Sequence, residues 1–405
     1  MTDLFSDDMR RNPYPTYDQL RSASPVFHVP PPLDAWLIFD YEGVWRALND
    51  HDAFSSKVPS PPNWFLFLDP PRHTKQRGLI ARAFTPRVVA NLEPFIRRLS
   101  REFLDAVIEG GEMDLVAGYT APLPMTVIAE LLGMSGVDLP RFERWSEGIL
   151  RISHTRSGAE TAAAAMQEFS AVTAEMDTYL TDLIAQRRAA PKDDLISRLV
   201  EAEVDGERLT PPEILGFFQL LIVGGQETTV NLINNAMLCL LEHPDQLDRL
   251  RANADLLPGA IEEVLRYRAP LQWVMRTPRR DVEIHGQVIP AGKLVLPMIG
   301  SANRDPKQFR DPNCFNITRD PNAHVAFGHG VHACLGAPLA RLEARIALMD
   351  LLGRLKDIRL ASAAPWPPRQ ALNVLGPASL PIRFEPARAR GQGGPEKARR
   401  TGENR

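Results

Sequence analysis

The chain has 405 residues, of which 44% are hydrophobic and 24% charged, and its formal net charge is −3. This composition is typical of a globular protein with a large core, and the near-neutral charge excludes a protein that binds nucleic acid through a strongly basic surface. The polar N-terminus lacks a signal peptide, no stretch of about 20 apolar residues is present, and three cysteines are widely spaced, so we expect a cytoplasmic protein with no membrane partner and no disulfide framework.

Apolar residues recur at helical spacing through most of the chain, which predicts a mainly α fold. In chain order, the predicted helices cover residues 92–108, 124–132, 162–187, 194–202, 212–242, 257–268 and 337–352. The segment 212–242 is predicted as one continuous helix. A further helix is expected to start at Pro70-Pro71, because proline is favoured in a first helical turn.

Strand-like alternation is sparse, and it predicts only a small β region. The candidate strands cover residues 35–40, 282–284, 294–298 and 381–384. We expect residues 1–387 to form one domain. Residues 388–405 are rich in glycine and basic residues, which indicates a disordered tail, with a basic partner-binding tail as the alternative.

The longest predicted helix contains Gly224-Gly225, and Glu227 and Thr228 follow after a single residue. Two glycines inside a helix each cost about 1 kcal/mol relative to alanine, so they indicate a bend or a close approach to the backbone. A carboxyl group beside a hydroxyl group at such a place is suited to proton transfer. Spacing alone is equally compatible with a contact between helices, in which Glu227 faces solvent.

A glycine-rich turn, Phe327–Gly336, carries the single Cys334 and precedes the last predicted helix. A cysteine at this place faces the free N–H groups and the positive end of the helix dipole, which favours the thiolate. A thiolate below a flat macrocycle is the ligand that favours O–O cleavage at haem iron. Zinc is the competing interpretation because three histidines are near Cys334 in sequence, although their spacing differs from that of paired zinc ligands. These are His324, His329 and His332.

The pattern Phe-Gly-x-Gly-x-His-x-Cys-x-Gly resembles the haem-binding signature of the cytochrome P-450 family, and residues 223–229 resemble its oxygen-activation motif. The resemblance covers nearly the whole chain. It implies the P-450 fold, mainly α with a small β region, in a single haem domain over residues 1–387. The residues it assigns are Cys334 as the axial ligand of the haem iron, Phe327, Gly328, Gly336 and Gly224 as haem contacts, and Glu227 and Thr228 as catalytic groups.

The resemblance also gives roles to charged residues whose spacing alone fits a solvated helix face or an ordinary exposed ion pair. Arginine suits carboxylates because its planar fork can donate two hydrogen bonds. The residues implied to bind the two haem propionates are His73, Arg77, Arg276 and His332. Those implied to form a buried ionic network with a structural role are Glu263, Arg266 and Arg319.

A P-450 of this kind is implied to be a monooxygenase that contains haem b and inserts one atom of O2 into a small hydrophobic molecule, most often by hydroxylation. Electrons would come from a separate ferredoxin and its ferredoxin reductase, because no such domain is recognisable in the chain. Cations that flank the cysteine turn and the propionate helix are candidates for docking this partner. They are Arg72, Lys75, Arg341 and Arg345.

Family position also suggests an apolar substrate pocket, although a core role is equally compatible with each of its residues. They are Trp64, Phe65, Phe67, Val223, Leu271, Trp273, Val274 and Leu372. Two alternatives remain: a P-450 that catalyses epoxidation, oxidative coupling or ring formation, and a haem- or zinc-binding sensor without turnover. The pair Glu227 and Thr228 favours an enzyme, since a sensor needs no proton relay.

Overall fold

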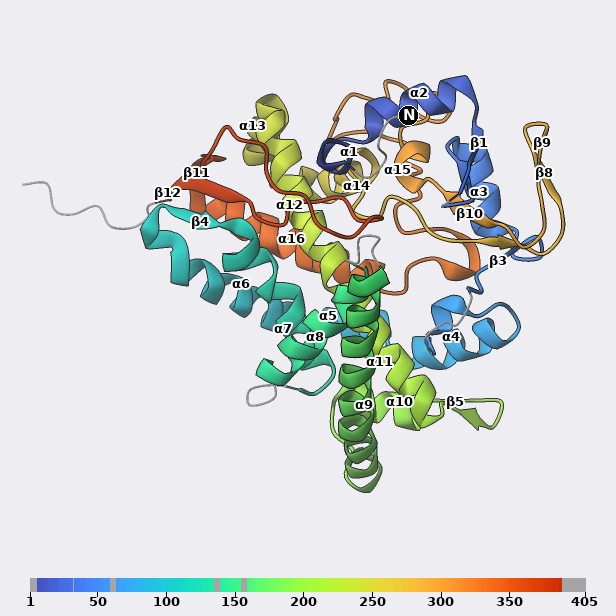
Figure 1. Ribbon diagram of the computed structural model, residues 1–405. Helices are drawn as coiled ribbons and strands as arrows, with labels where there is room; N and C mark the ends of the chain where they lie inside the picture. The colour runs from blue at the N-terminus through green and yellow to red at the C-terminus, as the bar shows by residue number, and fades with distance from the viewer. Residues whose placement is uncertain (1–5, 32, 59–62, 135–138, 154–158, 388–405) are drawn as a thin grey trace, which may run out of the picture.

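The computed structural model describes residues 6–31, 33–58, 63–134, 139–153 and 159–387 (Figure 1). Helices in the first half are α1 (Asp7–Arg11), α2 (Tyr14–Ala23), α3 (Tyr41–Asn49), α4 (Arg72–Ala83), α5 (Pro86–Asn91), α6 (Glu93–Val107), α7 (Pro122–Leu131), α8 (Leu139–Ser153) and α9 (Ala159–Ala189). They continue with α10 (Leu195–Glu201), α11 (Pro211–Gly225), α12 (Glu227–Glu242), α13 (Pro244–Ala252), α14 (Leu257–Tyr267), α15 (Ile299–Ala302) and α16 (Ala337–Arg354). Short 3-10 turns are η1 (Phe65–Phe67), η2 (Ile108–Gly110), η5 (Ala254–Leu256) and η6 (Gly330–His332), and η3 (Val116–Thr120) is a π-helical turn.

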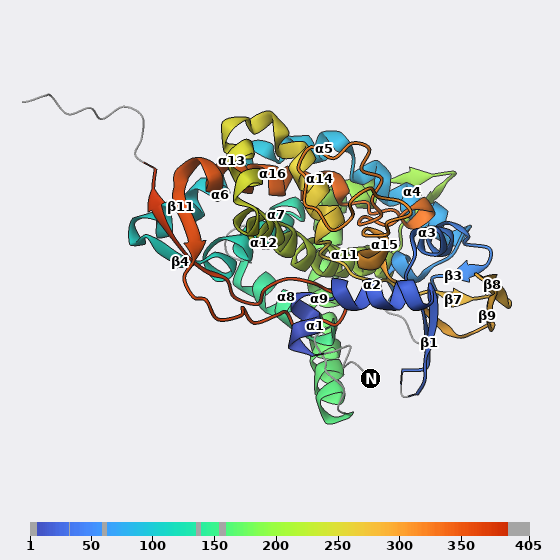
Figure 2. The same cartoon turned by 90° about the horizontal axis from the view of Figure 1, so that it is seen from above.

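Two three-stranded sheets lie at opposite ends of the helical body, as both views show (Figures 1 and 2). In the first, β2 (Ala35–Ile38) lies between antiparallel β1 (Val26–Val29) and parallel β10 (Leu294–Pro297). In the second, β12 (Pro381–Pro386) lies between β11 (Leu355–Leu360) and β4 (Glu112–Asp114), both antiparallel to it. Two-stranded ladders join β3 (Phe54–Ser55) to β7 (Thr277–Pro278), β5 (Glu203–Val204) to β6 (Glu207–Arg208), and β8 (Val282–Ile284) to β9 (Gln287–Ile289).

The four predicted strands are therefore confirmed, and each predicted helix has a counterpart whose ends differ from the prediction by at most three residues. One prediction is wrong: residues 212–242 do not form a continuous helix. Gln226 interrupts them with φ −84° and ψ −70°, so that α11 ends at Gly225 and α12 begins at Glu227. The backbone still donates from Gln226 N to Ile222 O (3.3 Å) and from Val230 N to Gln226 O (3.0 Å), so the axis bends rather than stops.

Close packing is present on one side of the helix at this bend. A Cβ atom on Gly225 would lie 2.9 Å from Cδ1 of Ile128 in α7, whereas a Cβ atom on Gly224 would meet no atom within 4 Å. The two glycines therefore face different surroundings: Gly225 is packed against a neighbouring helix, and Gly224 faces open space.

The core is formed around α12, which is buried from Thr229 to Leu240 and contacts α13, α14 and α16. Figure 2 shows it in the middle of the helical layer. Buried asparagines fix it to its neighbours: Asn235 Nδ2 donates to the carbonyls of Arg268 (3.1 Å) and Leu375 (2.9 Å), and Asn234 Oδ1 accepts from Thr120 Oγ1 (3.1 Å). The middle of α12 is therefore tied to η3, to the end of α14 and to the loop before β12.

Among the described residues no helix is both long and apolar enough to cross a bilayer. The predicted basic tail, residues 388–405, lies outside the described residues.

Candidate active site

Cys334 lies in the turn between η6 and the start of α16. Its backbone N donates to Phe327 O (2.8 Å), which closes the glycine-rich turn. Gly328 and Gly330 both have φ +68°, a conformation that other L-residues rarely adopt, and a Cβ atom on Gly330 would lie 2.9 Å from Oδ1 of Asn49. These two glycines are therefore required for the turn that presents the thiol.

The Cys334 side chain keeps accessible surface, although protein atoms crowd around it. Burial raises the pKa of its thiol, while the N–H groups of Gly336 and Ala337 and the guanidinium group of Arg77 lower it. The N–H groups at the helix start therefore act in the direction predicted from the sequence, and desolvation opposes them. A thiol that coordinates a metal ion is deprotonated outright, and the same N–H groups then stabilise the coordinated sulfur.

Four basic side chains from three segments of the chain converge beside this turn. His73 in α4 is fully buried, and its ring centroid lies 4.0 Å from that of His332 in η6. Arg77, one turn after His73, donates from Nη2 to Ala333 O (2.6 Å). Arg276 is 7% exposed and lies close enough for its charge to act on both histidines.

This cluster holds ring nitrogens without protein partners. His332 Nε2 and Ser56 Oγ are 3.0 Å apart, but His332 Nδ1 and both ring nitrogens of His73 are buried with no hydrogen-bond partner among the described residues. Burial, assisted by the neighbouring positive charges, lowers the pKa of His73 to about 4 and that of His332 to about 3. Burial likewise lowers the pKa of Arg276 to about 10. The carboxylate of Asp69 raises all three of these pKa values, but it does not outweigh the effect of burial.

The oxygen-activation motif predicted from the sequence lies at the bend between α11 and α12. Glu227 begins α12 and is 5% exposed. Thr228 Oγ1 donates to Gly224 O (2.5 Å), which is the back-bond that a threonine can form inside a helix. Ser146 of α8 donates from Oγ to Gln226 Oε1, so the bend is also tied to the helix that covers it.

Part of the predicted substrate pocket forms one aromatic cluster beside α11. Trp64 donates from Nε1 to Gln219 Oε1 (2.9 Å), and its ring stacks on that of Phe67 at 5.8 Å. The centroid of the Phe65 ring lies 5.8 Å from that of His73 and 6.1 Å from that of Phe217. Val223 and Trp64 are both partly buried residues that pack against the large core that contains Phe65.

The close approach of this segment to α11 depends on Gly216. A Cβ atom there would lie 1.8 Å from the carbonyl oxygen of Asn63, so only glycine permits the contact.

The other predicted pocket residues are dispersed. Leu271 and Val274 pack against the cluster around β2, β10 and α3, whereas Trp273 packs against a third cluster at α1 and α2. Leu372 is 37% exposed in the loop before β12. The structure therefore brings together Trp64, Phe65 and Phe67, and it separates Trp273 from them.

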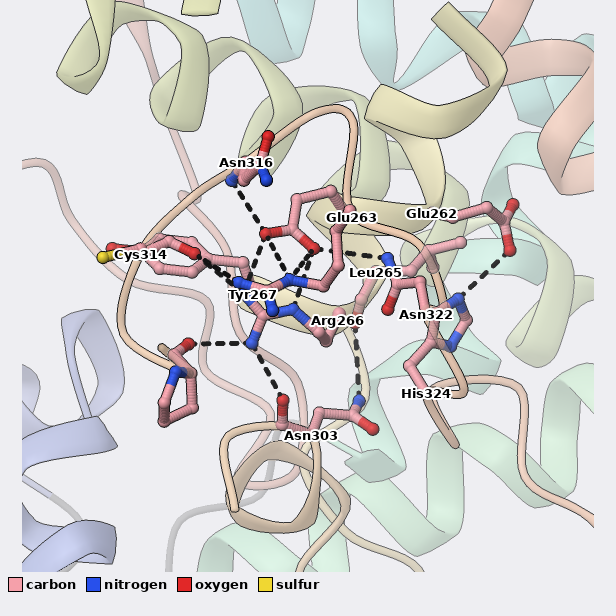
Figure 3. A network of polar contacts seen from close by, with 12 residues as sticks. Glu262, Glu263, Leu265, Arg266, Tyr267, Asn303, Cys314, Asn316, Asn322 and His324 are labelled. Carbon is pink, nitrogen blue, oxygen red and sulfur yellow. Dashed lines mark hydrogen bonds and ion pairs between the residues drawn. The ribbon is translucent and has the colours of Figure 1, made fainter. Parts of the chain in front are cut away.

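Glu263 and Arg266 in α14 form a fully buried ion pair (Figure 3), with Arg266 donating to both carboxylate oxygens at 2.8 Å. Arg319 donates from Nε to the same carboxylate at 3.1 and 3.2 Å. Asn316 N and Asn322 Nδ2 also donate to this carboxylate, at 2.8 and 3.2 Å. The other N–H groups of Arg266 and Arg319 donate to backbone carbonyls, so the network ties α14 to the segment that leads to the cysteine turn. Those carbonyls belong to Asn303, Arg310, Asp311, Pro312 and Cys314.

The sequence profile of the family described as "Cytochrome P450" matches residues 36–358 of the chain. The chain belongs to the cytochrome P450 family. It is 41% identical to "Cytochrome P450 monooxygenase PikC" of Streptomyces venezuelae, over 98% of this chain and 95% of that protein. It is 39% identical to "Steroid C26-monooxygenase" of Mycolicibacterium smegmatis, over 92% of both chains. The crystal structure of CYP109E1 from Bacillus megaterium in complex with testosterone superposes with a TM-score of 0.85, at 38% identity over 92% of this chain and 99% of that chain.

The family and fold predicted from the sequence are therefore confirmed, and the protein is a haem-dependent cytochrome P450 monooxygenase. The side chains beside Cys334 fit such a cofactor. Buried basic groups whose ring nitrogens lack partners are costly unless an anion pairs with them, and a haem has two propionates. Arg77 connects these groups to the turn of Cys334 through the carbonyl of Ala333.

Sequence reasoning missed polar residues that hold this P450 site from a distance. Ser56 bonds to His332, 276 residues away, and Gln219 bonds to Trp64, 155 residues away. No local pattern marks either residue, because the partner of each lies far away in the sequence.

Proposed function

We propose that Cys334 is the axial ligand of the iron of haem b, and that the basic cluster binds its propionates. The unpaired ring nitrogens of His73 and His332 are the observation that carries this proposal, because they form a buried set of donors beside the cysteine turn. Haem with an axial thiolate supplies reductive activation of O2. The propionate-binding residues in this proposal are His73, Arg77, Arg276 and His332. Phe327, Gly328 and Gly336 would shape the cysteine side of the cofactor, with Gly224 on the opposite side.

We further propose that Glu227 and Thr228 deliver protons to the oxygen that reacts. One turnover consumes O2, two electrons and two protons; one oxygen atom enters the substrate and the other leaves as water. The Thr228 hydroxyl lies at the bent part of the helix, where Gly224 faces open space. The buried Glu227 carboxyl stands next to it and can pass protons from solvent to this hydroxyl.

We propose an apolar substrate of steroid size, with hydroxylation as the main reaction. Trp64, Phe65 and Phe67 form an aromatic wall beside α11, and such a surface suits a flat hydrocarbon skeleton. Two relatives support the class: the steroid C26-monooxygenase and the CYP109E1 complex with testosterone. Gln219, which holds Trp64, is a polar group close to this wall.

We propose a separate ferredoxin and its reductase as electron donors. The candidate docking cations form only a weak patch, because each has an acidic partner, namely Glu213 for Arg72, Glu207 for Lys75, Glu262 for Arg341 and Glu93 for Arg345. All three cysteines are free, which supports a reducing compartment and hence the cytoplasm.

The function is tested by titrating the purified haem protein with a steroid, a long-chain fatty acid and a macrolide aglycone while recording its absorption spectrum. We expect the steroid to produce the largest high-spin shift, and to yield a product that carries one added oxygen atom when ferredoxin and reductase are supplied. A larger shift and faster product formation with the fatty acid would contradict the proposed substrate class. A protein that binds no haem would contradict the site.

Thr228→Ala is expected to reduce the product formed per electron pair about 10-fold while electron consumption continues. The reason is that the variant lacks the hydroxyl group through which protons are passed to the oxygen. The ratio of product to NADPH consumed measures this effect. Thr229→Ala, which removes the adjacent buried hydroxyl, serves as the control and should retain coupling. Full coupling in Thr228→Ala would contradict the relay.

A further inference from the structure

One face of α12 lies against the loop that precedes β12. Asn235 Nδ2 donates to Leu375 O (2.9 Å), and a Cβ atom on Gly376 would lie 2.1 Å from Asn231 Oδ1. Glu227, Asn231 and Asn235 are four residues apart, so they lie in one row on the same face of the helix. The loop therefore runs beside this row, and Glu227 is the member nearest the bend.

The backbone of Arg369 is fixed beside Gly376 in this loop. Its N–H donates to Gly376 O (2.9 Å), and Pro368 and Pro377 form a bridge next to it. From α1, Arg10 donates from Nη1 to Arg369 O (3.0 Å) and from Nη2 to the carbonyl of Gln370 (2.8 Å). The side chain of Arg369 thus starts from an anchored position next to the row on α12.

The guanidinium group of Arg369 lies within electrostatic reach of Glu227. Burial lowers the pKa of Arg369, and the carboxylates of Glu227 and then Asp114 raise it. Arg369 Nε is buried and has no hydrogen-bond partner among the described residues, and the same holds for both amide atoms of Asn231. Buried polar atoms of this kind are ordinarily satisfied by ordered water, so Arg369 Nε and the amide of Asn231 offer donors and an acceptor to water beside this row.

We propose that Arg369 is a positioning residue for Glu227. Its guanidinium group orients the carboxylate, and with Asn231 it holds the water from which Glu227 takes up protons. Each proton passes from this water to Glu227 and on toward Thr228, and both protons of a turnover leave in the water that is formed from O2. This inference rests on the proposed role of Glu227, and it assigns the path of protons to the side of α12 that faces the C-terminal loop.

A purely structural role for Arg369 predicts a different result, because loss of a loop anchor would weaken the protein whether or not Glu227 is present. A residue that acts through Glu227 has no further effect once that carboxylate is gone. A double-mutant cycle between the two positions separates these cases.

The experiment compares the wild-type haem protein with Arg369→Gln, Arg369→Lys, Glu227→Gln and the double variant Glu227→Gln/Arg369→Gln. The readouts are product per NADPH and the solvent deuterium isotope effect on turnover, with the CO spectrum as a check on the haem site. We expect Arg369→Gln to lower coupling at least threefold and to raise the isotope effect, and Arg369→Lys to stay within twofold of wild type. The double variant should match Glu227→Gln. Arg383→Gln, which removes a partly exposed arginine paired with Glu112, is the control and should leave both readouts unchanged.

Wild-type coupling and isotope effect in Arg369→Gln would overturn the proposal, as would a double variant whose loss equals the product of the two single losses. If Arg369→Gln fails to bind haem, Arg369→Lys decides: coupling within twofold of wild type supports the proposal, and a larger loss overturns it. Wild-type coupling in Glu227→Gln would instead refute the proposed role of Glu227, and with it the inference that depends on that role.

Discussion

Cys334→Ala is expected to abolish the long-wavelength Soret band of the reduced CO complex and to reduce substrate oxidation by at least about 1,000-fold, a loss of about 4 kcal/mol of transition-state stabilisation. The reason is that alanine offers no donor atom, and electron density from the thiolate is what favours O–O cleavage. The measurement is the CO difference spectrum, followed by product formation with the proposed ferredoxin and reductase.

Cys314→Ala is the matched control for this variant. Cys314 is also free and exposed, and it meets the ionic network only through its backbone carbonyl, which remains in the alanine variant. We expect its spectrum and activity to equal those of the wild type. An unchanged Soret band in Cys334→Ala would refute the ligand assignment and direct attention to the histidines of the same turn.

Elements with strong local signals were predictable from the sequence. The apolar period of residues 92–108 predicts a helix that the structure has as α6, and the prediction for residues 257–268 agrees with α14. The bend at Gln226 was not predicted, although the two glycines before it indicated a bend as one possibility. Gly225 packs against Ile128 of α7 beside the bend, and a distant packing partner of this kind leaves no local pattern.

Buried charges were the least predictable part of the site. The sequence spacing of His73 and Arg77 fits an exposed basic face, yet His73 is fully buried beside His332. Glu343 in α16 is another example. It is a charged residue of a predicted helix, yet Glu343 is only 1% exposed. Burial raises the pKa of its carboxyl to about 8, so it is protonated at neutral pH and tolerated in an apolar core.

The ionic network around Glu263 shows why resemblance was more informative than spacing. An i, i+3 pair of acid and arginine is ordinarily exposed and contributes about 0–1 kcal/mol. Here both side chains of the pair are 0% exposed, and the second arginine, Arg319, comes from a segment more than 50 residues away. Only tertiary packing turns this common helical pattern into a buried structural network.

Glu263→Gln is expected to lower the free energy of unfolding by about 3–5 kcal/mol, because two guanidinium groups lose the carboxylate that compensates their charge. A P450 domain of ordinary stability, about 5–15 kcal/mol, loses a large part of its stability by such a change. Urea unfolding of the haem protein, followed through the Soret band and through far-UV circular dichroism, measures the effect.

The adjacent residue offers a matched control, because Glu262→Gln removes the same charge from a less buried side chain. Burial raises the pKa of Glu262, but hydrogen bonds from Arg341 and His324 lower it to about 2. Its folded-state pKa is therefore below the unfolded value of about 4.3, so its contribution is present above pH 4.3 and is lost as the pH falls toward 2. At pH 7 we expect Glu262→Gln to cost about 1 kcal/mol or less, which is less than its pKa shift alone implies, because solvent screens a pair whose side chains are 31% (Glu262) and 41% (Arg341) exposed. Equal losses of unfolding free energy in the two variants would show that burial of the Glu263 pair is not what makes the network important. A several-fold larger loss in Glu263→Gln would show that the fold around the cysteine turn depends on this one compensated charge.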